Sequence, residues 1–248
     1  MIDSFLVAIS FISSIPVPKK FIPVWNSKTL RYFCLMLPVV GIIFAFLWFM
    51  FWFILCRLVM LSFILRGFIM MLFTLALTGG IHLDGLMDTC DAIFSHRDRE
   101  TRLKILSDTH AGSFAVIGCI TILMARTLLS TEIFSSGLHL YSFAFIPVYS
   151  RLGMSLLLVN LPFAKDSGLA VMLGSSRKKR DNITLAIMLL SFMAFTSKII
   201  PVIMVTFMFM WGKLCMKLFG GITGDLLGAF VELSEVIMLM GMVIMNCI

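Results

Sequence analysis

Long apolar stretches separated by short polar segments dominate the pattern along this chain. The stretch from Cys34 to Cys56 holds no charged residue, and Ile183 to Ser197 is a shorter stretch of the same kind. A helix needs about 20 apolar residues to cross the hydrocarbon core of a bilayer. An open strand would leave its backbone groups unsatisfied in lipid. The pattern therefore predicts membrane-spanning helices at residues 33–56, 60–79, 113–130, 139–161, 183–198, 200–219 and 228–248.

These segments predict an all-α, polytopic bundle of six or seven spans, because the two segments that meet near Pro201 could form one broken helix. A further apolar stretch, Phe5 to Ile15, follows Asp3 and precedes Lys19 and Lys20. A secretory signal would carry its positive charge before the apolar part. We therefore expect this stretch to be retained, lying in or partly entering the membrane. Residues 1–248 are expected to form one integral-membrane domain.

Composition supports this reading and excludes other classes. The chain is 60% hydrophobic, with a mean hydropathy of +1.05, which is more apolar surface than a soluble domain can bury. Its six cysteines are scattered without a CxxC pair, so neither a disulfide framework nor a zinc knuckle is expected. The net charge of +7 follows from Lys and Arg in short loops, and no nucleic-acid partner is expected.

The distribution of Lys and Arg predicts the orientation of the chain. With the N-terminus in the cytoplasm, only Arg57, Arg66 and Lys198 fall toward the outer side of the cytoplasmic (inner) membrane. The segments 80–112, 162–182 and 220–227 then share the cytoplasmic face. The basic run Arg177 to Arg180 is interpreted as a determinant of this topology, with attraction of anionic lipid or of a phosphate-bearing substrate as the alternative.

An acidic cluster follows the second predicted span. Asp84, Asp88 and Asp91 are spaced by four and three residues, which places them on one face of a helix, and His82 precedes them on the membrane side. Like charges this close recruit a cation or resist ionisation. An oxygen-only set suits Mg²⁺, and no HExxH motif indicates zinc. A solvated helix start beside a basic loop is the structural alternative.

Two further groups are predicted on the same face. Asp108 is a candidate metal or substrate ligand, or else a helix cap. The glycine-rich segment 220–229 suggests an anion cradle at Gly224, with Asp225 as a candidate metal ligand. Glu232 shares the face of Asp225 and enters the membrane, where it needs a partner, and Arg151 is the candidate counter-ion.

With these motifs assembled, the chain resembles the cobalamin synthase family, the adenosylcobinamide-GDP ribazoletransferases. The HxDGxxDxxD core and the GGxTGDxxGA segment are specific together, and the resemblance follows the chain in order. The matching stretches are Ile15 to Pro18, Leu37 to Gly41, Gly79 to Asp91, Leu106 to Phe114, Ser150-Arg151, Asp166 to Leu169 and Gly220 to Glu235.

The resemblance implies a reaction and its participants. α-Ribazole or its 5′-phosphate attacks the phosphate joined to cobinamide in adenosylcobinamide-GDP, and GMP leaves in a magnesium-dependent step. Asp84, Asp88 and Asp91 match the acidic motif of the family, and one of them or His82 would take the ribazole hydroxyl proton. Membrane lipid is the expected surrounding. Whether a homo-oligomer forms stays open.

The same resemblance implies second-tier roles for residues outside the core motif. Asp108 and Asp225 match further acidic positions as secondary ligands, with Gly224 and Arg151 in the matching substrate-binding stretches. The sequence departs from the family pattern at three positions, which bear on fine geometry more than on reaction class: Ala92, His110 and Ala115.

Two other functions compete with this reading. A membrane phosphotransferase that joins a nucleotide-activated headgroup to a lipid alcohol would carry an Ala-Arg pair where this chain has Asp88 and Thr89. An ion-coupled transporter would place its carboxylates in broken helices at the membrane midplane, often in inverted repeats, and no such repeat is evident in the sequence.

Overall fold

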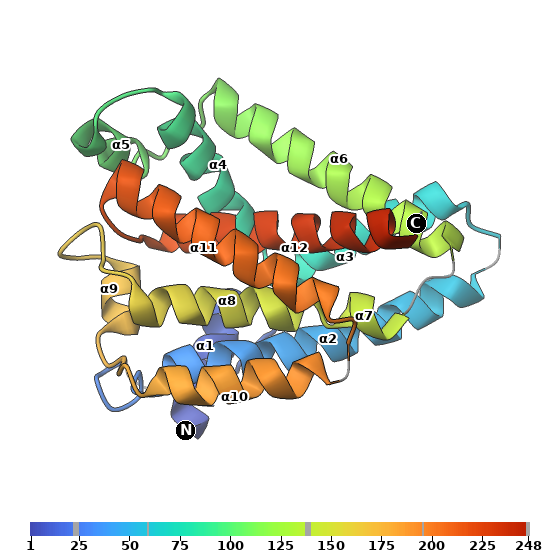
Figure 1. Ribbon diagram of the computed structural model, residues 1–248, viewed down its shortest axis with the longest axis horizontal. Helices are drawn as coiled ribbons and strands as arrows, with labels where there is room; N and C mark the ends of the chain where they lie inside the picture. The colour runs from blue at the N-terminus through green and yellow to red at the C-terminus, as the bar shows by residue number, and fades with distance from the viewer. Residues whose placement is uncertain (22–24, 59, 137–139, 195, 247–248) are drawn as a thin grey trace.

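The computed structural model describes residues 1–21, 25–58, 60–136, 140–194 and 196–246, and its regular structure is helical (Figure 1). Successive long helices run in opposite directions along the long axis of the molecule. The elements are α1 (Ile2–Ile12), a 3₁₀ turn (Lys19–Phe21), α2 (Phe33–Arg57), α3 (Phe63–Thr78), α4 (Ile81–Phe94), α5 (Arg99–Ile105), α6 (Ser113–Ser136), α7 (Leu140–Ala144), α8 (Ile146–Asn160), α9 (Leu169–Gly174), α10 (Asp181–Met193), α11 (Ile199–Phe219) and α12 (Gly224–Asn246).

The predicted all-α, polytopic architecture is confirmed. Five helical stretches in the described part of the chain are long and apolar enough to cross a membrane, and α3 with α4 makes a sixth if the bent pair is one span. The five are Phe33–Arg57, Ser113–Ser136, Ser142–Asn160, Ile199–Phe219 and Gly224–Met245.

Two predicted segments differ in detail from the structure. The expected span 183–198 is α10, a helix of 13 residues, which is shorter than a straight crossing requires. The break expected near Pro201 separates α10 from α11, and a second break lies between α3 and α4, which are bent by 94°. Gly79 and Gly80 make this bend, with φ angles of 64° and 78° that favour glycine.

The helix α8 forms the centre of the bundle. Its residues are buried along nearly its whole length, and it packs against α2 at Gly41, where an added Cβ would lie 2.8 Å from the Val148 Cα. A methyl group cannot be accommodated at that distance without a shift of the backbone. Large rings of both helices, such as Trp48 of α2 and Tyr149 of α8, are buried in the core.

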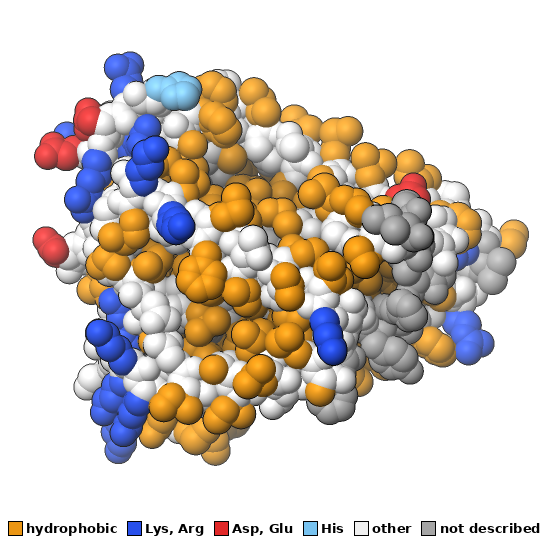
Figure 2. Space-filling view, in the orientation of Figure 1, with side chains coloured by type: hydrophobic (Ala, Val, Ile, Leu, Met, Phe, Trp, Pro, Cys, Tyr) orange, Lys and Arg blue, Asp and Glu red, His pale blue; other side chains and the backbone are white. Residues whose placement is uncertain are grey.

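Polar segments gather at one end of the bundle, as the sequence predicts. Figure 2 shows Lys and Arg side chains concentrated at the end where α5 and α9 lie in Figure 1, beside a largely apolar flank. Arg31 holds Asp181 through two hydrogen bonds of 3.0 Å at this end. The Lys165 ammonium donates to the Ser107 hydroxyl, and the Ala164 N–H donates to the Ile222 carbonyl at 2.9 Å. The segments 80–112, 162–182 and 220–227 therefore meet on one face.

Candidate active site

Glycines bring α4 against α12 and set the frame of the site. An added Cβ at Gly85 would lie 2.8 Å from the Asp225 carbonyl oxygen, and one at Gly228 would lie 3.2 Å from the His82 Cα. Only residues without side chains permit this approach of two helix backbones. The contact places the start of the acidic motif beside Asp225.

Asp84 and Asp225 line one cavity, from α4 and α12 respectively. Their charges interact, and the Asp88 carboxylate interacts electrostatically with Asp84, Asp225 and Asp91. The predicted acidic residues therefore form one electrostatic group. Within the described ranges, however, no three His, Cys, Asp or Glu side chains lie close enough together to enclose a metal ion.

Asp91 differs from the other two carboxylates of the motif. It accepts hydrogen bonds from the backbone N–H groups of Gly112 at 2.6 Å and Ala115 at 2.8 Å, at the start of α6. A carboxylate at a helix N-terminus satisfies free N–H groups and complements the helix dipole. Asp91 thus has a structural partner that its spacing in the sequence does not reveal.

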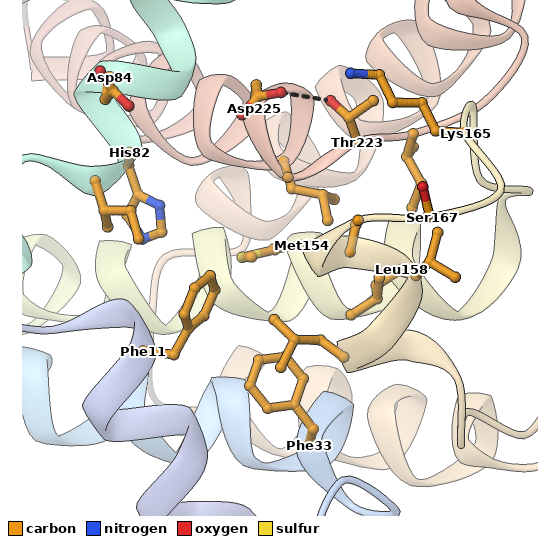
Figure 3. Close-up of a pocket in the computed structure, with 18 residues that line it drawn as sticks. Phe11, Phe33, His82, Asp84, Met154, Leu158, Lys165, Ser167, Thr223 and Asp225 are labelled. Carbon is orange, nitrogen blue, oxygen red and sulfur yellow. Dashed lines mark hydrogen bonds between the residues drawn. The ribbon is translucent and has the colours of Figure 1, made fainter. Parts of the chain in front are cut away.

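His82 lies at the inner wall of the cavity. Its side chain is 3% exposed, and its Nε2 atom has no hydrogen-bond partner among the described residues. A buried polar atom without a partner is costly unless a ligand satisfies it. In Figure 3 the imidazole lies just below Asp84, from the same helix.

Asp108 is on the same face but outside the cavity lining. It is exposed and accepts hydrogen bonds from the His110 side chain at 2.7 Å and the His110 N–H at 3.0 Å, which hold its pKa below the usual range. Its charge still reaches Asp88. The position fits an outer ligand better than a residue inside the cavity.

The cavity has a volume of about 330 Å³ and two unlike sides. Figure 3 shows Asp225, Thr223 and Lys165 along one side, with Phe11 and Phe33 on the other. The Thr223 hydroxyl donates to the Asp225 carboxylate at 3.3 Å and accepts from the Leu226 N–H, so it caps α12 while it orients the carboxylate. Gly224, from the segment interpreted as an anion cradle, also lines the cavity.

Lys165 also lines the cavity, although the sequence analysis does not single it out. A short ladder holds its segment to the turn before α12: Phe163 bridges Ile222, and the Ile222 N–H donates to the Pro162 carbonyl at 2.9 Å. An added Cβ at Gly221 would lie 2.6 Å from that same Pro162 oxygen. Because Gly221 has no side chain, the segment that carries Lys165 can pack against this turn, and the lysine reaches the cavity. Its place in a loop of the sequence does not indicate this contact.

The predicted counter-ion of Glu232 is corrected by the structure. Arg126, from α6, donates to Glu232 at 2.8 Å and lies 3.1 Å from Glu235, whereas Arg151 pairs with Glu235. The Arg151 side chain is 1% exposed and lies outside the cavity lining. Its predicted substrate contact therefore has no counterpart in this arrangement. Periodicity could not choose between two arginines on different helices.

Comparison with known proteins identifies the family of this chain. The family model described as cobalamin-5-phosphate synthase matches residues 4–243. A protein of Geobacillus sp. (strain WCH70) is 33% identical over 240 residues, covering 93% of this chain and 91% of the relative, and is named adenosylcobinamide-GDP ribazoletransferase. A relative from Clostridium botulinum (strain Langeland), with the same name, is 32% identical and is covered over 99% of both chains. No solved structure matches the chain.

Proposed function

Because the chain belongs to the cobalamin-5-phosphate synthase family, we propose that it is an adenosylcobinamide-GDP ribazoletransferase, the activity for which its relatives are named. The observation that carries this proposal is the match over nearly the whole chain. It includes both halves of the cavity, the acidic motif of α4 and the start of α12.

The proposed reaction is a phosphoryl transfer between two large substrates. A hydroxyl oxygen of α-ribazole or its 5′-phosphate forms a bond to the phosphorus that is linked to cobinamide. The bond from that phosphorus to the oxygen of GMP breaks, GMP leaves, and the hydroxyl proton passes to a base. Such transfers depend mainly on positioning and on stabilisation of phosphate charge.

The chemistry of the carboxylates fits magnesium. Mg²⁺ in phosphoryl-transfer sites is commonly held by one or two carboxylates, with waters and substrate phosphates completing its shell. Asp84 and Asp225 face the cavity as such a pair, with Asp88 beside them. A bound magnesium ion supplies positive charge to the phosphate oxygens. We assign the ion to Asp84 and Asp225, with Asp88, Asp91 and Asp108 in supporting positions.

We assign His82 as the general base that accepts the proton of the attacking hydroxyl. Its Nε2 is buried, lacks a hydrogen-bond partner among the described residues and belongs to a side chain that lines the cavity. A neutral imidazole with a free nitrogen can accept a hydrogen bond from a hydroxyl and then its proton. Asp84, two residues later on the same wall, is the alternative base.

The same proposal places the protein in the cytoplasmic membrane with the cavity facing the cytoplasm. Several apolar helices support a multi-pass membrane protein. The concentration of Lys and Arg at the cavity end supports the orientation.

A purified-protein assay tests the activity. The protein in detergent or liposomes is supplied with adenosylcobinamide-GDP, α-ribazole or its 5′-phosphate, and Mg²⁺, and GMP is measured by chromatography. We expect GMP release that stops with a chelator and returns with added Mg²⁺. A folded protein that releases no GMP with either nucleoside refutes the proposal.

Asp84→Asn tests the site within this assay. We expect a loss of turnover of at least about 100-fold, since the amide is a poor ligand for a hard cation and cannot take a proton. Glu100→Gln is the matched control, because Glu100 is an exposed carboxylate on α5 outside the cavity lining. Wild-type turnover in Asp84→Asn would remove Asp84 from the mechanism.

A further inference from the structure

The cavity combines an apolar floor with a charged rim. Phe11 and Phe33 face it with ring centroids 6.3 Å apart and planes inclined by 57°, and Met154 and Leu158 complete the floor. Flat aromatic groups are favoured against such rings. The rim instead carries Asp84, Asp225, Thr223 and Lys165, so one end of a ligand is expected to be apolar and the other ionic (Figure 3).

The volume of the cavity limits what it can hold. About 330 Å³ is at the lower end for small-molecule pockets, which are roughly 300 to 1,000 Å³. A mononucleotide with a bicyclic base is of this order. Adenosylcobinamide-GDP adds a corrin macrocycle to a nucleoside diphosphate and needs far more space. The smaller substrate is therefore the better match.

Among the described residues that line this cavity, Lys165 is the single Lys or Arg. Its charge acts on Asp225, yet no ion pair joins it to a carboxylate in the part of the chain that the structure describes; its ammonium donates to the Ser107 hydroxyl instead. The ladder between 162–164 and 222 fixes its segment. A positioned ammonium beside an apolar floor suits a ligand with an aromatic base and an anionic group.

We propose that the cavity binds the ribazole substrate, with its base against the partly exposed ring of Phe11, and that Lys165 binds a phosphate monoester on its sugar. Lys165 thereby makes the enzyme prefer α-ribazole 5′-phosphate to α-ribazole. Ser107 positions the ammonium through its hydroxyl. This inference rests on the proposed transferase function and specifies which substrate the cavity takes.

The test compares α-ribazole with α-ribazole 5′-phosphate as substrates of the same enzyme. With saturating adenosylcobinamide-GDP, kcat/KM is measured for α-ribazole 5′-phosphate and for α-ribazole. We expect the wild type to prefer the phosphate by about 10- to 100-fold, the scale of one charge-assisted hydrogen bond. Lys165→Gln should bring this ratio close to one by raising KM for the phosphate alone, while Lys165→Arg keeps part of the preference.

Three variants control the interpretation. Lys104→Gln removes an exposed lysine of α5 at the same end of the molecule and should leave the ratio unchanged. Ser107→Ala should lower the ratio less than Lys165→Gln does. Phe11→Leu should raise KM for both nucleosides equally, because both carry the same base.

The outcomes separate this inference from its premise. A phosphate preference that persists in folded Lys165→Gln overturns it. An increase in KM for adenosylcobinamide-GDP, with both nucleosides affected equally, also overturns it and assigns Lys165 to the diphosphate. Absence of GMP from the wild type with either nucleoside refutes the transferase function itself, and the inference with it.

Discussion

At the scale of single residues, equal spacing on a helix conceals unequal roles. Asp84 and Asp91 lie seven positions apart on α4, so the sequence places them on one face. Asp84 lines the cavity, whereas both oxygens of Asp91 accept N–H groups at the start of α6. An argument from periodicity finds the face but not the partner of each side chain.

Asp91→Ala tests the structural role of this carboxylate. Loss of the two hydrogen bonds to Gly112 and Ala115 should cost about 0.5–2 kcal/mol, the usual range for a helix N-cap. Thermal unfolding in detergent with a chelator present measures this without any contribution from a bound ion. Asp91→Asn keeps an acceptor oxygen and should lose less. Equal melting temperatures for Asp91→Ala and wild type would contradict the assignment.

Lys165 shows what the sequence could not provide at this scale. In the sequence it is one of several loop lysines that fit a membrane topology. Its hydroxyl partner, Ser107, lies 58 positions earlier in the chain, and the ladder to Ile222 joins it to a third segment. Contacts between distant loops depend on the packing of the whole bundle, which residue spacing does not encode.

At the scale of elements, the length of apolar runs predicted most of the helices but not the bend that makes the site. The predicted span 33–56 corresponds to α2, and 200–219 to α11. In contrast, α4 lies in the segment 80–112 between two predicted spans, where the spacing of three aspartates predicts a helical face but not a bend before it. The 94° turn at Gly79 and Gly80 needs their backbone angles, and glycine at these positions permits such angles without requiring them.

Gly85→Ala tests the contact between α4 and α12. The new methyl group would meet backbone atoms of Asp225 at 2.8 and 2.9 Å, so the two helices must separate. We expect turnover to fall by about 100-fold, as for a misplacement of roughly 1 Å in an active site. Overpacking should cost about 1–3 kcal/mol of stability.

The matched control for this variant is Gly212→Ala on α11, where the nearest atoms lie 3.4 and 3.5 Å from the added Cβ. That spacing is ordinary contact, so activity and melting temperature should stay near wild type. Turnover in Gly85→Ala equal to that in Gly212→Ala would show that the close approach does not govern the site.

The buried ion pairs that join α6, α8 and α12 carry a second prediction at this scale. Arg126 and Arg151 balance Glu232 and Glu235 inside the bundle. Arg126→Leu leaves one buried carboxylate without its partner and should destabilise the protein by about 3–5 kcal/mol. Denaturation in detergent measures the loss.

Charge balance supplies the control. Arg126→Leu/Glu232→Leu removes one charge of each sign and leaves Arg151 with Glu235, so the double variant should be more stable than Arg126→Leu alone. A double variant that is no more stable than the single one would mean that packing, and not charge, explains the loss.

At the scale of the whole molecule, the end of the bundle that carries the cavity is also the end where most Lys and Arg side chains gather. The cavity, the basic run near α10 and the segment around α5 all lie at one end of the bundle, and the short turn between α2 and α3 lies toward the other (Figure 1). Lys and Arg crowd the first end (Figure 2). Since positive loops are retained in the cytoplasm, the cavity is expected to open to the compartment that holds nucleotide substrates.

Cysteine labelling tests this orientation in right-side-out membrane vesicles. In a background with the six native cysteines replaced, Met60→Cys lies in the turn after α2, where Met60 is 98% exposed, and Ser175→Cys lies beside the basic run. A membrane-impermeant maleimide should label Met60→Cys at once and Ser175→Cys only after the vesicles are opened, because the proposed orientation puts the two positions on opposite sides of the bilayer. GMP release by both variants in detergent confirms that neither substitution disturbs the fold. The opposite labelling pattern would put the carboxylates and Lys165 on the outer face, away from the cytoplasmic nucleotide pool, and the proposed supply of substrate to the cavity would fail.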